Sequence, residues 1–365
     1  MTVAAEFLRS INIPADLARP ERLAHFHPTA KSVRVLEAVA FGQPGAATMV
    51  IAAYGSGKSI AAAVGALLVE NTPTGSTVLS PIAERLAGVD SALARRFAAR
   101  QTDAAARGLV IALHGHVPDL AAAIAAQAGL DCSCFLDGML ERLVARARRR
   151  RRDRIAIVWD EFGRHLEGLI ADGCAADLLD VQTLAEWAAR QARPHATLTL
   201  LLHQNLLNYA GRLNQSARSS WRKIEGRFEV LRFVEDSREL YQLIGRLLAT
   251  RPLSAGAATP SRATGARMLE LGWFHGVADA DEVARLVAQA APLTPGALHA
   301  LPLVAARVAQ QERSVFSFLH QAERAGTVGI EDVYRYFAEV MRTDSGLGGT
   351  QRRWLAATCV PSSKA

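Results

Sequence analysis

Short apolar segments alternate with longer helical stretches along the first two thirds of the chain. The apolar segments are too short for helices and are rich in Val, Ile, Leu and Thr, so they predict buried strands. They are Ala46–Ala53, Gly108–Leu113, Ile155–Trp159, Thr197–Leu202 and Phe228–Phe233. Strands that alternate with helices predict an α/β fold with a mostly parallel sheet covered on both faces, a three-layer sandwich.

The chain before the first predicted strand reads as helical. Within Lys31–Phe41, four apolar residues share one face of a helix, and Gly42-Gln43-Pro44-Gly45 ends it. These four are Val33, Leu36, Val39 and Ala40. We therefore predict a helical lead-in over residues 1–44.

The pattern changes after residues 235–250. Arg251–Gly265 is rich in Gly, Pro, Ser and Ala without periodicity, which predicts a linker or long loop, and Arg267–Met341 is helical throughout. We predict a lead-in (1–44), an α/β core (45–240), an all-helical domain (241–345) and a tail (346–365).

Composition narrows the class of protein. Of 365 residues 50% are hydrophobic, which excludes a disordered chain, and only 6% are aromatic, which disfavours a sandwich or barrel of strands. The 42 Lys and Arg against 35 Asp and Glu give a net charge of +7, which favours a polyanionic partner. Four cysteines are no disulfide framework, and neither a signal peptide nor a membrane-spanning run is evident. We expect a cytoplasmic protein.

A glycine-rich turn links the first predicted strand to a predicted helix, Lys58–Glu70. The segment Ala52-Ala53-Tyr54-Gly55-Ser56-Gly57-Lys58-Ser59 matches the phosphate-loop pattern G-x-x-x-x-G-K-[ST] except at Ala52. Glycines let backbone N–H groups surround phosphate oxygens, Lys58 would reach the β and γ phosphates, and Ser59 would coordinate magnesium. The alternative is a Gly-Ser turn that caps an ordinary helix. The predicted ATP-binding residues are Gly55, Ser56, Gly57, Lys58, Ser59 and Ile60.

Two adjacent acids end the third predicted strand. Asp160 would bind Mg²⁺ and Glu161 would act as general base toward the attacking water. The alternative is a strand that ends in a polar loop. Adjacent acids after such an apolar run favour an ATPase that cleaves the β–γ phosphoanhydride, with Lys58 also catalytic, and argue against a small-molecule kinase.

Polar residues also end the fourth predicted strand. In strand-catalytic-glutamate NTPases the strand beside the acidic one carries a residue that senses the γ phosphate, and His203, Gln204 or Asn205 are the candidates here. A histidine at a strand end is more often structural.

Five motifs occur in an order that resembles a known family. They are Tyr54-Gly55-Ser56-Gly57-Lys58-Ser59, Trp159-Asp160-Glu161-Phe162-Gly163, Leu202-His203-Gln204, Glu225-Gly226-Arg227-Phe228 and Gln311-Glu312-Arg313-Ser314-Val315-Phe316-Ser317-Phe318-Leu319. The chain resembles the AAA-like P-loop ATPases of bacterial phage-defence islands, akin to the large ATPase subunit of BREX systems. The resemblance implies a homo-oligomer or an assembly with other defence subunits, a helical lid that closes over the nucleotide, and a member shortened at its C-terminus.

Two arginines are candidate arginine fingers. Arg227 precedes the last predicted strand and Arg313 lies in the helical domain. Either would place a guanidinium on the γ phosphate, in cis or from a neighbouring subunit. Most arginines in this chain are solvated, and the sequence does not choose between the two.

A run of arginines precedes the acidic strand. Its members are Arg146, Arg148, Arg149, Arg150, Arg151 and Arg152. They would contact the phosphate backbone of DNA or RNA, or they form a solvated helix end, because no aromatic residue interleaves to stack on bases. The nearby pairs Cys132/Cys134 and His114/His116 match no common zinc spacing, so we expect packing residues there.

The sequence as a whole predicts an ATP- and Mg²⁺-dependent ATPase that couples nucleotide state to a partner or to DNA. The alternative is a nucleotide-gated scaffold or regulator with little hydrolysis, which Ala52 favours and the Asp160–Glu161 pair disfavours.

Overall fold

The computed structural model describes residues 11–43, 47–52, 56–131, 134–173, 178–210, 215–233, 237–248, 261–308, 315, 317–319 and 326–343. They form two compact units. The larger unit comprises the described residues of Ser10–Ala53 and Gly57–Phe233, and the smaller one comprises those of Val234–Ala365 together with Ser56.

The larger unit is built on a five-stranded parallel sheet. Its strands are β1 (Ala47–Ile51), β2 (Leu109–His114), β3 (Arg154–Asp160), β4 (His195–Leu202) and β5 (Glu229–Arg232). The spatial order is β2-β3-β4-β1-β5, and every pairing is parallel. All five predicted strands are present, so the predicted α/β fold with a parallel sheet is confirmed.

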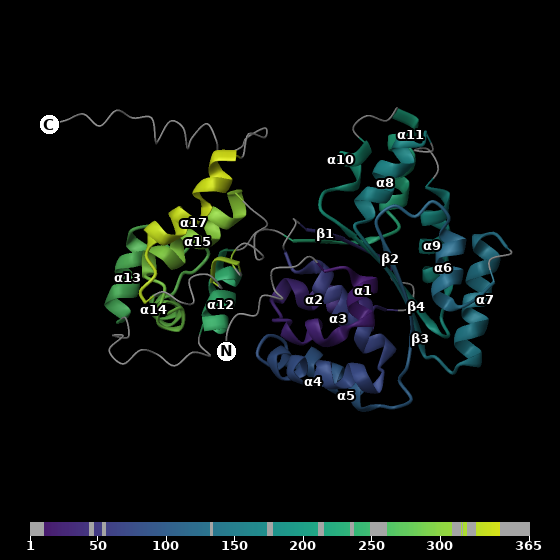
Figure 1. Ribbon diagram of the computed structural model, residues 1–365, viewed down its shortest axis with the longest axis horizontal. Helices are drawn as coiled ribbons and strands as arrows, with labels where there is room; N and C mark the ends of the chain where they lie inside the picture. Colours follow the sequence, from purple (N-terminus) through teal and green to yellow (C-terminus); the bar gives the residue numbers. More distant parts are fainter. Residues whose placement is uncertain are drawn as a thin grey trace. The chain divides into compact units, whose positions relative to one another are not determined.

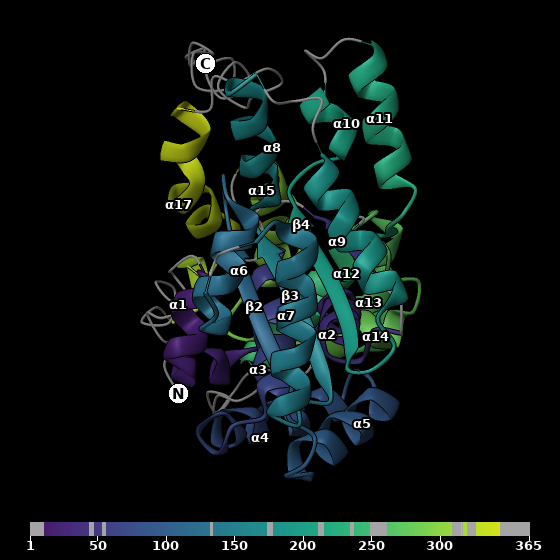
Figure 2. The same cartoon turned by 90° about the vertical axis from the view of Figure 1, so that its right-hand side faces the viewer.

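Helices cover both faces of this sheet. One layer contains α1 (Ile13–Ala18), the 3₁₀ helix η2 (Pro20–His25), α2 (Ala30–Phe41) and α3 (Lys58–Glu70), with α4 (Pro73–Ala87) and α5 (Ser91–Thr102) packed on its outside. The other layer contains α6 (Leu120–Ala128), α7 (Leu136–Arg149), α8 (Phe162–Ala171) and α9 (Leu179–Arg190), followed by α10 (Leu206–Tyr209) and α11 (Gln215–Glu225). Figure 1 shows α2 and α3 on one side of the strands and α6, α7 and α9 on the other, and Figure 2 shows α6 and α7 in front of the sheet.

The strand side chains alternate between two hydrophobic cores. Val110 and Ala112 face the α2–α3 layer, whereas Ile111 and Leu113 face the α6–α9 layer. Hydrophobic side chains of β3 follow the same period of two, from Ile155 to Trp159. Because both faces are covered, the strands read as continuous apolar runs.

The strand register aligns four carboxyl ends at one edge of the sheet. His114 of β2 pairs with Asp160 of β3, Trp159 of β3 pairs with Leu200 of β4, and Ile51 of β1 pairs with Leu202 of β4. The β4 strand therefore lies between the strand before the predicted phosphate loop and the strand that ends in Asp160.

The smaller unit is helical in its described part. It contains α12 (Ser237–Leu248), α13 (Arg262–Glu270), α14 (Ala280–Gln289), α15 (Pro295–Val308) and α17 (Ile330–Thr343), with a single parallel bridge between Leu293 and Val328. Their common core includes Tyr241, Phe274, Leu298 and Phe337. The predicted tail, 346–365, lies outside the described residues.

The predicted linker Arg251–Gly265 is wrong at its end, because α13 begins at Arg262. The Ser261 hydroxyl caps this helix by accepting a hydrogen bond from the Thr264 N–H at 3.3 Å. Gly265 lies within this helix. A Cβ at this position would be 2.2 Å from the Ala280 carbonyl oxygen, so the glycine permits close packing of α13 on α14. Residues 251–260 lie outside the described part of the chain.

Across the described residues, none of the helices has both the length and the apolar character needed to cross a membrane.

Close packing of α2 on α3 gives a first prediction. A Cβ at Gly65 would lie 2.9 Å from the Val39 Cβ and 3.2 Å from the Leu36 carbonyl oxygen. Gly65→Ala should therefore lower the free energy of unfolding by about 1–3 kcal/mol, measured by urea denaturation. A double variant with Val39→Gly should lose less than the sum of the two single losses, since it removes the Val39 Cβ that is the nearest atom. Strictly additive losses would show that the two helices are not in such close contact.

Candidate functional site

The amino-terminal end of α3 is open to an anion. Gly57 precedes the helix with φ of 77° in the left-handed region, no side chain caps the helix, and its first turn has no acidic residue. A helix start without a side-chain cap is a common place for an anion, because its first backbone N–H groups, here including that of Ile60, point along the helix axis and the helix dipole adds partial positive charge. Of the predicted phosphate loop, Gly55 lies outside the described residues.

Lys58 is a buried cation at this helix end, with a 7% exposed side chain. Burial lowers the pKa of its ammonium, while the carboxylates of Asp160 and Glu161 partly offset that shift. Ser56 is also buried, and its hydroxyl has no hydrogen-bond partner among the described residues. A buried ammonium suits a phosphate ligand.

Asp160 connects the end of β3 to the start of α3. Its Oδ1 accepts a hydrogen bond from the Ser59 hydroxyl at 3.1 Å and another from the Glu161 backbone N–H at 2.9 Å. Burial raises the pKa of this carboxyl, and the two hydrogen bonds and the nearby Lys58 and His114 oppose the shift. The two predicted Mg²⁺ ligands, Ser59 and Asp160, thus lie in direct contact.

Glu161 has a strained backbone and two cationic neighbours. Its φ of 49° and ψ of 38° place a residue with a side chain in the left-handed region. Its Oε2 lies 2.7 Å from Arg164 Nε and 3.6 Å from His114 Nε2. Both cations thus lie beside the Glu161 carboxylate.

His203 follows β4 at the same edge of the sheet. Its Nδ1 lies 2.9 Å from the Tyr209 hydroxyl. Burial lowers the pKa of His203, as does Lys58 to a smaller extent, while Glu167 and Glu161 oppose the shift. Charged groups of the candidate site therefore act on this imidazole, although the tautomer is not fixed by the Tyr209 contact.

The other two sensor candidates lie beside His203. Gln204 is half-buried, and the Asn205 Oδ1 accepts a hydrogen bond from Arg232 at the end of β5. The Asn205 side chain is thus held on the β5 side of the edge.

Of the two candidate arginine fingers, Arg227 lies within the described residues and Arg313 does not. Arg227 precedes β5 at the amino-terminal edge of the sheet, opposite Lys58, and its Nη1 lies 3.0 Å from Glu186 Oε1. Topology therefore removes the in-cis role for Arg227, and a role from a neighbouring subunit stays a hypothesis.

A buried aromatic cluster supports the end of β3. The Trp159 indole N–H donates to the Gly115 carbonyl oxygen at 2.9 Å, and its ring lies 4.5 Å from that of His165. Gly163 permits the approach of Tyr209, whose hydroxyl would be 2.0 Å from a Cβ at this position. The motif Trp159-Asp160-Glu161-Phe162-Gly163 thus combines two acids with the packing residues that fix them.

Sequence reasoning missed His114 and Arg164. His114 directly follows the apolar run Gly108–Leu113, as Asp160 directly follows Ile155–Trp159, so its place at this edge could be predicted from the sequence. Arg164 is three residues after Glu161, which is the spacing of neighbours on a helix. Both signals were available in the sequence.

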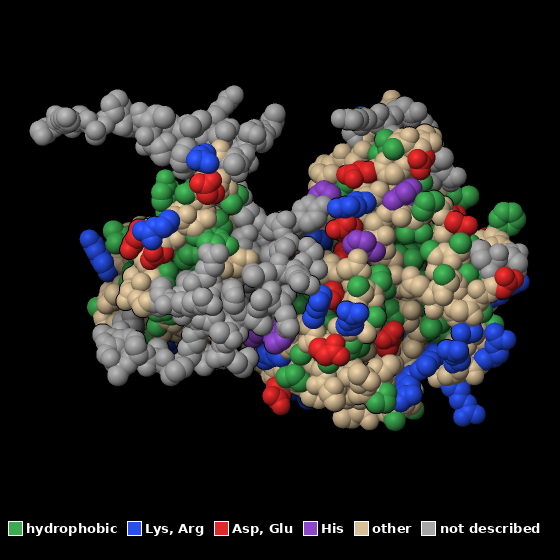
Figure 3. Space-filling model, viewed as in Figure 1, with side chains coloured by type: hydrophobic (Ala, Val, Ile, Leu, Met, Phe, Trp, Pro, Cys, Tyr) green, Lys and Arg blue, Asp and Glu red, His purple; other side chains and the backbone are tan. Residues whose placement is uncertain are grey.

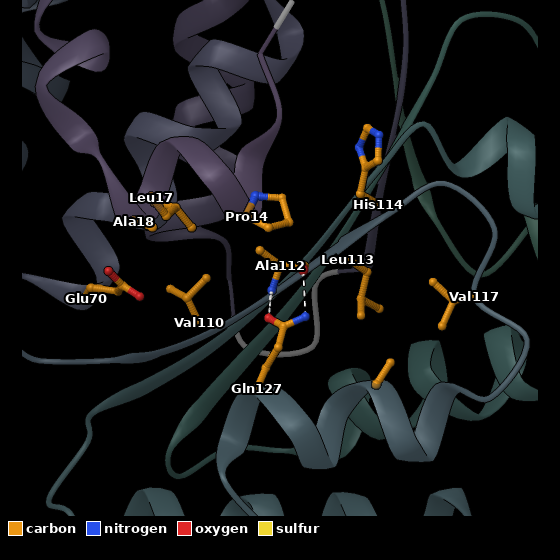
Figure 4. Close-up of a pocket in the computed structure, with 11 residues that line it drawn as sticks. Pro14, Leu17, Ala18, Glu70, Val110, Ala112, Leu113, His114, Val117 and Gln127 are labelled. Carbon is orange, nitrogen blue, oxygen red and sulfur yellow. Dashed lines mark hydrogen bonds between the residues drawn. The ribbon is translucent and has the colours of Figure 1, made fainter.

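A cleft of about 580 Å³ lies along the free edge of β2, next to the candidate site (Figure 4). At its floor the Gln127 side-chain amide accepts a hydrogen bond from the Ala112 N–H and donates one to the Ala112 carbonyl, both at 2.7 Å. This pairing blocks the addition of a further strand at Ala112. Lys58 and Asp160 do not line the cleft, so it is separate from the candidate phosphate site.

The larger unit joins β1 through a Gly-Ser-Gly-Lys-Ser loop to α3, with the acidic end of β3 one strand away across β4. The fold is that of a P-loop nucleoside triphosphatase. No protein-family model matches the sequence, and no curated protein matches it. Among solved structures, the chain is similar to the ORC2 protein of Aeropyrum pernix in its ADPNP-ADP complexes, with 13% identity and a TM-score of 0.38 over 92% of this chain and 71% of that chain. The geometry of the site carries the functional assignment.

The buried His165 gives a prediction for the pH dependence of stability. Burial lowers the pKa of His165 to about 4, with a smaller contribution from His116. The folded state thus holds this imidazole neutral, while the unfolded chain takes up a proton below about pH 6.5. Stability from this group is complete above pH 6.5 and falls toward pH 4, by at most about 1.4 kcal/mol per pH unit.

Urea denaturation between pH 7 and pH 4 tests this expectation. His165→Gln should remove that component of the slope. An unchanged slope in the His165 variant would contradict the assignment of the low pKa to this residue.

Proposed function

We propose that the protein binds ATP and hydrolyses its β–γ phosphoanhydride. The observation that carries this proposal is the 3.1 Å hydrogen bond between Ser59 and Asp160. This hydrogen bond joins the start of α3 to the end of β3. Helix starts of this kind bind phosphates, and hydrolysis requires an acidic residue at a neighbouring strand end.

Residues at the start of α3 would bind the triphosphate. The backbone N–H groups of Gly57 to Ile60 would donate to phosphate oxygens, and the buried Lys58 ammonium would contact the β and γ phosphates. The residues fit Mg²⁺ by their chemistry, since a hydroxyl and a carboxylate are hard oxygen ligands. Ser59 and Asp160 would hold the ion, which supplies positive charge that neutralises the phosphates.

Glu161 would act as the general base. Its carboxylate would accept a proton from the attacking water molecule, and Arg164 and His114, which lie beside Oε2, would orient it. His203 would contact the γ phosphate from β4, and the Tyr209 hydroxyl would orient its ring.

A second function, nucleotide binding without turnover, is favoured by one observation. The Arg164 guanidinium lies 2.7 Å from the Glu161 carboxylate, so it would compete with the attacking water molecule for that group. The protein would then act as a nucleotide-gated scaffold, and Ala52 in place of the first glycine agrees with that function.

The wider role remains a proposal from the five motifs. In this proposal the segment 45–240 is the ATPase core and 241–345 the lid, and copies of the chain, or other subunits of a phage-defence system, assemble so that an arginine reaches the γ phosphate. The resemblance to BREX ATPases supports this part, and the site geometry supports the ATPase activity.

Lys58→Ala tests nucleotide binding. It should weaken ATP binding at least about 100-fold, because a charge-assisted contact of about 3 kcal/mol is lost. Fluorescent-nucleotide titration measures the affinity, and circular dichroism checks the fold. Lys223→Ala, at an exposed lysine of α11, is the matched control and should bind like the wild type. Wild-type affinity in the Lys58 variant would remove the phosphate-loop assignment.

Glu161→Gln separates hydrolysis from binding. The amide keeps the shape but accepts no proton, so single-turnover hydrolysis should fall by about 10²–10⁴-fold while ATP affinity is kept. Glu84→Gln, at an exposed residue of α4, controls for the change in charge. If the wild type binds ATP and the variant hydrolyses it at the same rate as the wild type, or neither hydrolyses it, the scaffold function is supported and the ATPase function is contradicted.

A further inference from the structure

The arginine run lies at the amino-terminal edge of the sheet, opposite the candidate nucleotide site. Helix α7 ends at Arg149, Arg150 and Arg151 form the following turn, and β3 begins at Arg154. Arg148, Arg149, Arg150 and Arg151 are exposed, whereas Arg146 and Arg152 are half-buried. Figure 3 shows Lys and Arg side chains gathered over this end of α7, at the lower right. These six residues are the arginine surface.

Hydrogen bonds join the backbone that carries the arginine surface to the neighbouring loops. Three loops that lead into β2, β3 and β4 are joined where the Asp153 N–H donates to the Arg107 carbonyl at 3.0 Å and the His195 N–H donates to the Asp153 carbonyl at 3.1 Å. Arg148 Nη2 donates to the Arg193 carbonyl at 2.9 Å, which attaches the end of α7 to the loop before β4. The guanidiniums therefore project from a rigid part of the core.

The positive charge of this surface is not neutralised by acids within it. Asp153, the one acid of the run, is occupied by Arg100, whose guanidinium reaches both carboxylate oxygens at 2.6 and 3.1 Å. Among the ion pairs between described residues, none involves Arg146 or Arg148–Arg151. Arg152 lowers the pKa of Glu70, while burial, the larger effect, raises it. Desolvation, followed by Arg150 and Arg149, lowers the pKa of Arg146, so the neighbours that act on it are cations.

This charge exceeds what the helix end needs. One or two cations in the last turn stabilise the carboxyl end of a helix. Here Arg146, Arg148 and Arg149 occupy the last turn, and Arg150 and Arg151 extend the charge beyond it. Like charges at this density repel one another, and an external polyanion relieves that repulsion.

We propose that the arginine surface binds the phosphate backbone of duplex nucleic acid without sequence preference. Guanidiniums match phosphate oxygens in a bidentate geometry. No aromatic residue lies in the run, which disfavours single strands because these are held by base stacking.

The surface also lacks what a membrane contact requires. The most exposed large hydrophobic residue of the described chain, Phe135, precedes α7 at its opposite end. A helix of 14 residues is about 20 Å long, so this side chain is far from the arginines. Stable attachment to a lipid surface needs apolar residues beside the charges.

A salt titration tests the proposal without nucleotide, so that its failure is independent of the ATP site. The wild type should bind a random-sequence duplex, with log affinity falling by about 0.9 per contacted phosphate against log salt. Replacing Arg148, Arg149, Arg150 and Arg151 with Gln should weaken binding at least about tenfold at 50 mM salt and flatten the slope by up to about 3.6.

Two further variants make the result specific. The same four residues replaced by Lys keep the charge and should retain most of the salt slope, which separates charge from misfolding. Replacing the exposed arginines Arg19, Arg34, Arg95 and Arg222 with Gln removes equal charge elsewhere on the larger unit and should leave the slope unchanged. Phosphatidylserine vesicles and a single strand of the same sequence are the competing ligands.

The outcomes are distinct. Loss of slope in the first Gln variant alone supports the proposal. Absent duplex binding at low salt, equal slopes in the two Gln variants, or preferred binding to vesicles or to the single strand would overturn it.

Discussion

The parallel register of the sheet is the constraint on which the candidate site depends. Each crossover returns the chain to the same end of the sheet, so β1, β2, β3 and β4 deliver their following residues to one edge. Gly57 to Ser59, Asp160, His203 and His114 are far apart in sequence and meet only for this reason. If the pairing of β3 shifted by one residue, each of its side chains would move to the other face of the sheet. Asp160 would then lose its hydrogen bond with Ser59.

Burial gives this edge its chemical character. Lys58, Asp160 and His203 have pKa values moved first of all by loss of water, in the direction that disfavours the charged form of each. The ammonium of Lys58 and the carboxyl of Asp160 oppose each other's shift, so neither charge is buried alone. The arginine surface at the other edge is exposed and repelling. One sheet thus carries a desolvated, balanced set of charges at one edge and a solvated, unbalanced set at the other.

The sequence predicted the parts that depend on local pattern. Apolar runs identified all five strands, and the runs are clearest in β1 to β4 because these strands are buried over most of their length. The glycine-rich turn and the two acids were identified by their residue types next to those runs. The sequence could not predict interactions set by tertiary contact. From the sequence, Arg227 is a candidate arginine finger in cis, but it precedes β5 and so lies at the opposite edge of the sheet. Gly265 has the sequence context of a loop residue, because the residue that it packs against, Ala280, is distant in the sequence.

Helix α3 shows how the fold supports a site that breaks local rules. The amino-terminal end of α3 has no side-chain cap and begins with a buried lysine, and the nearby Glu161 has a left-handed backbone conformation. Its end is fully bonded: the Asn71 Nδ2 donates to the carbonyls of Arg100, Asp103 and Ala106 at 2.8, 3.0 and 3.2 Å. Arg100 in turn binds the carbonyls of Leu68 and Val69 and both oxygens of Asp153. The helix is therefore anchored at the edge that carries the arginine surface, and this anchoring fixes the position of its amino-terminal end at the candidate site.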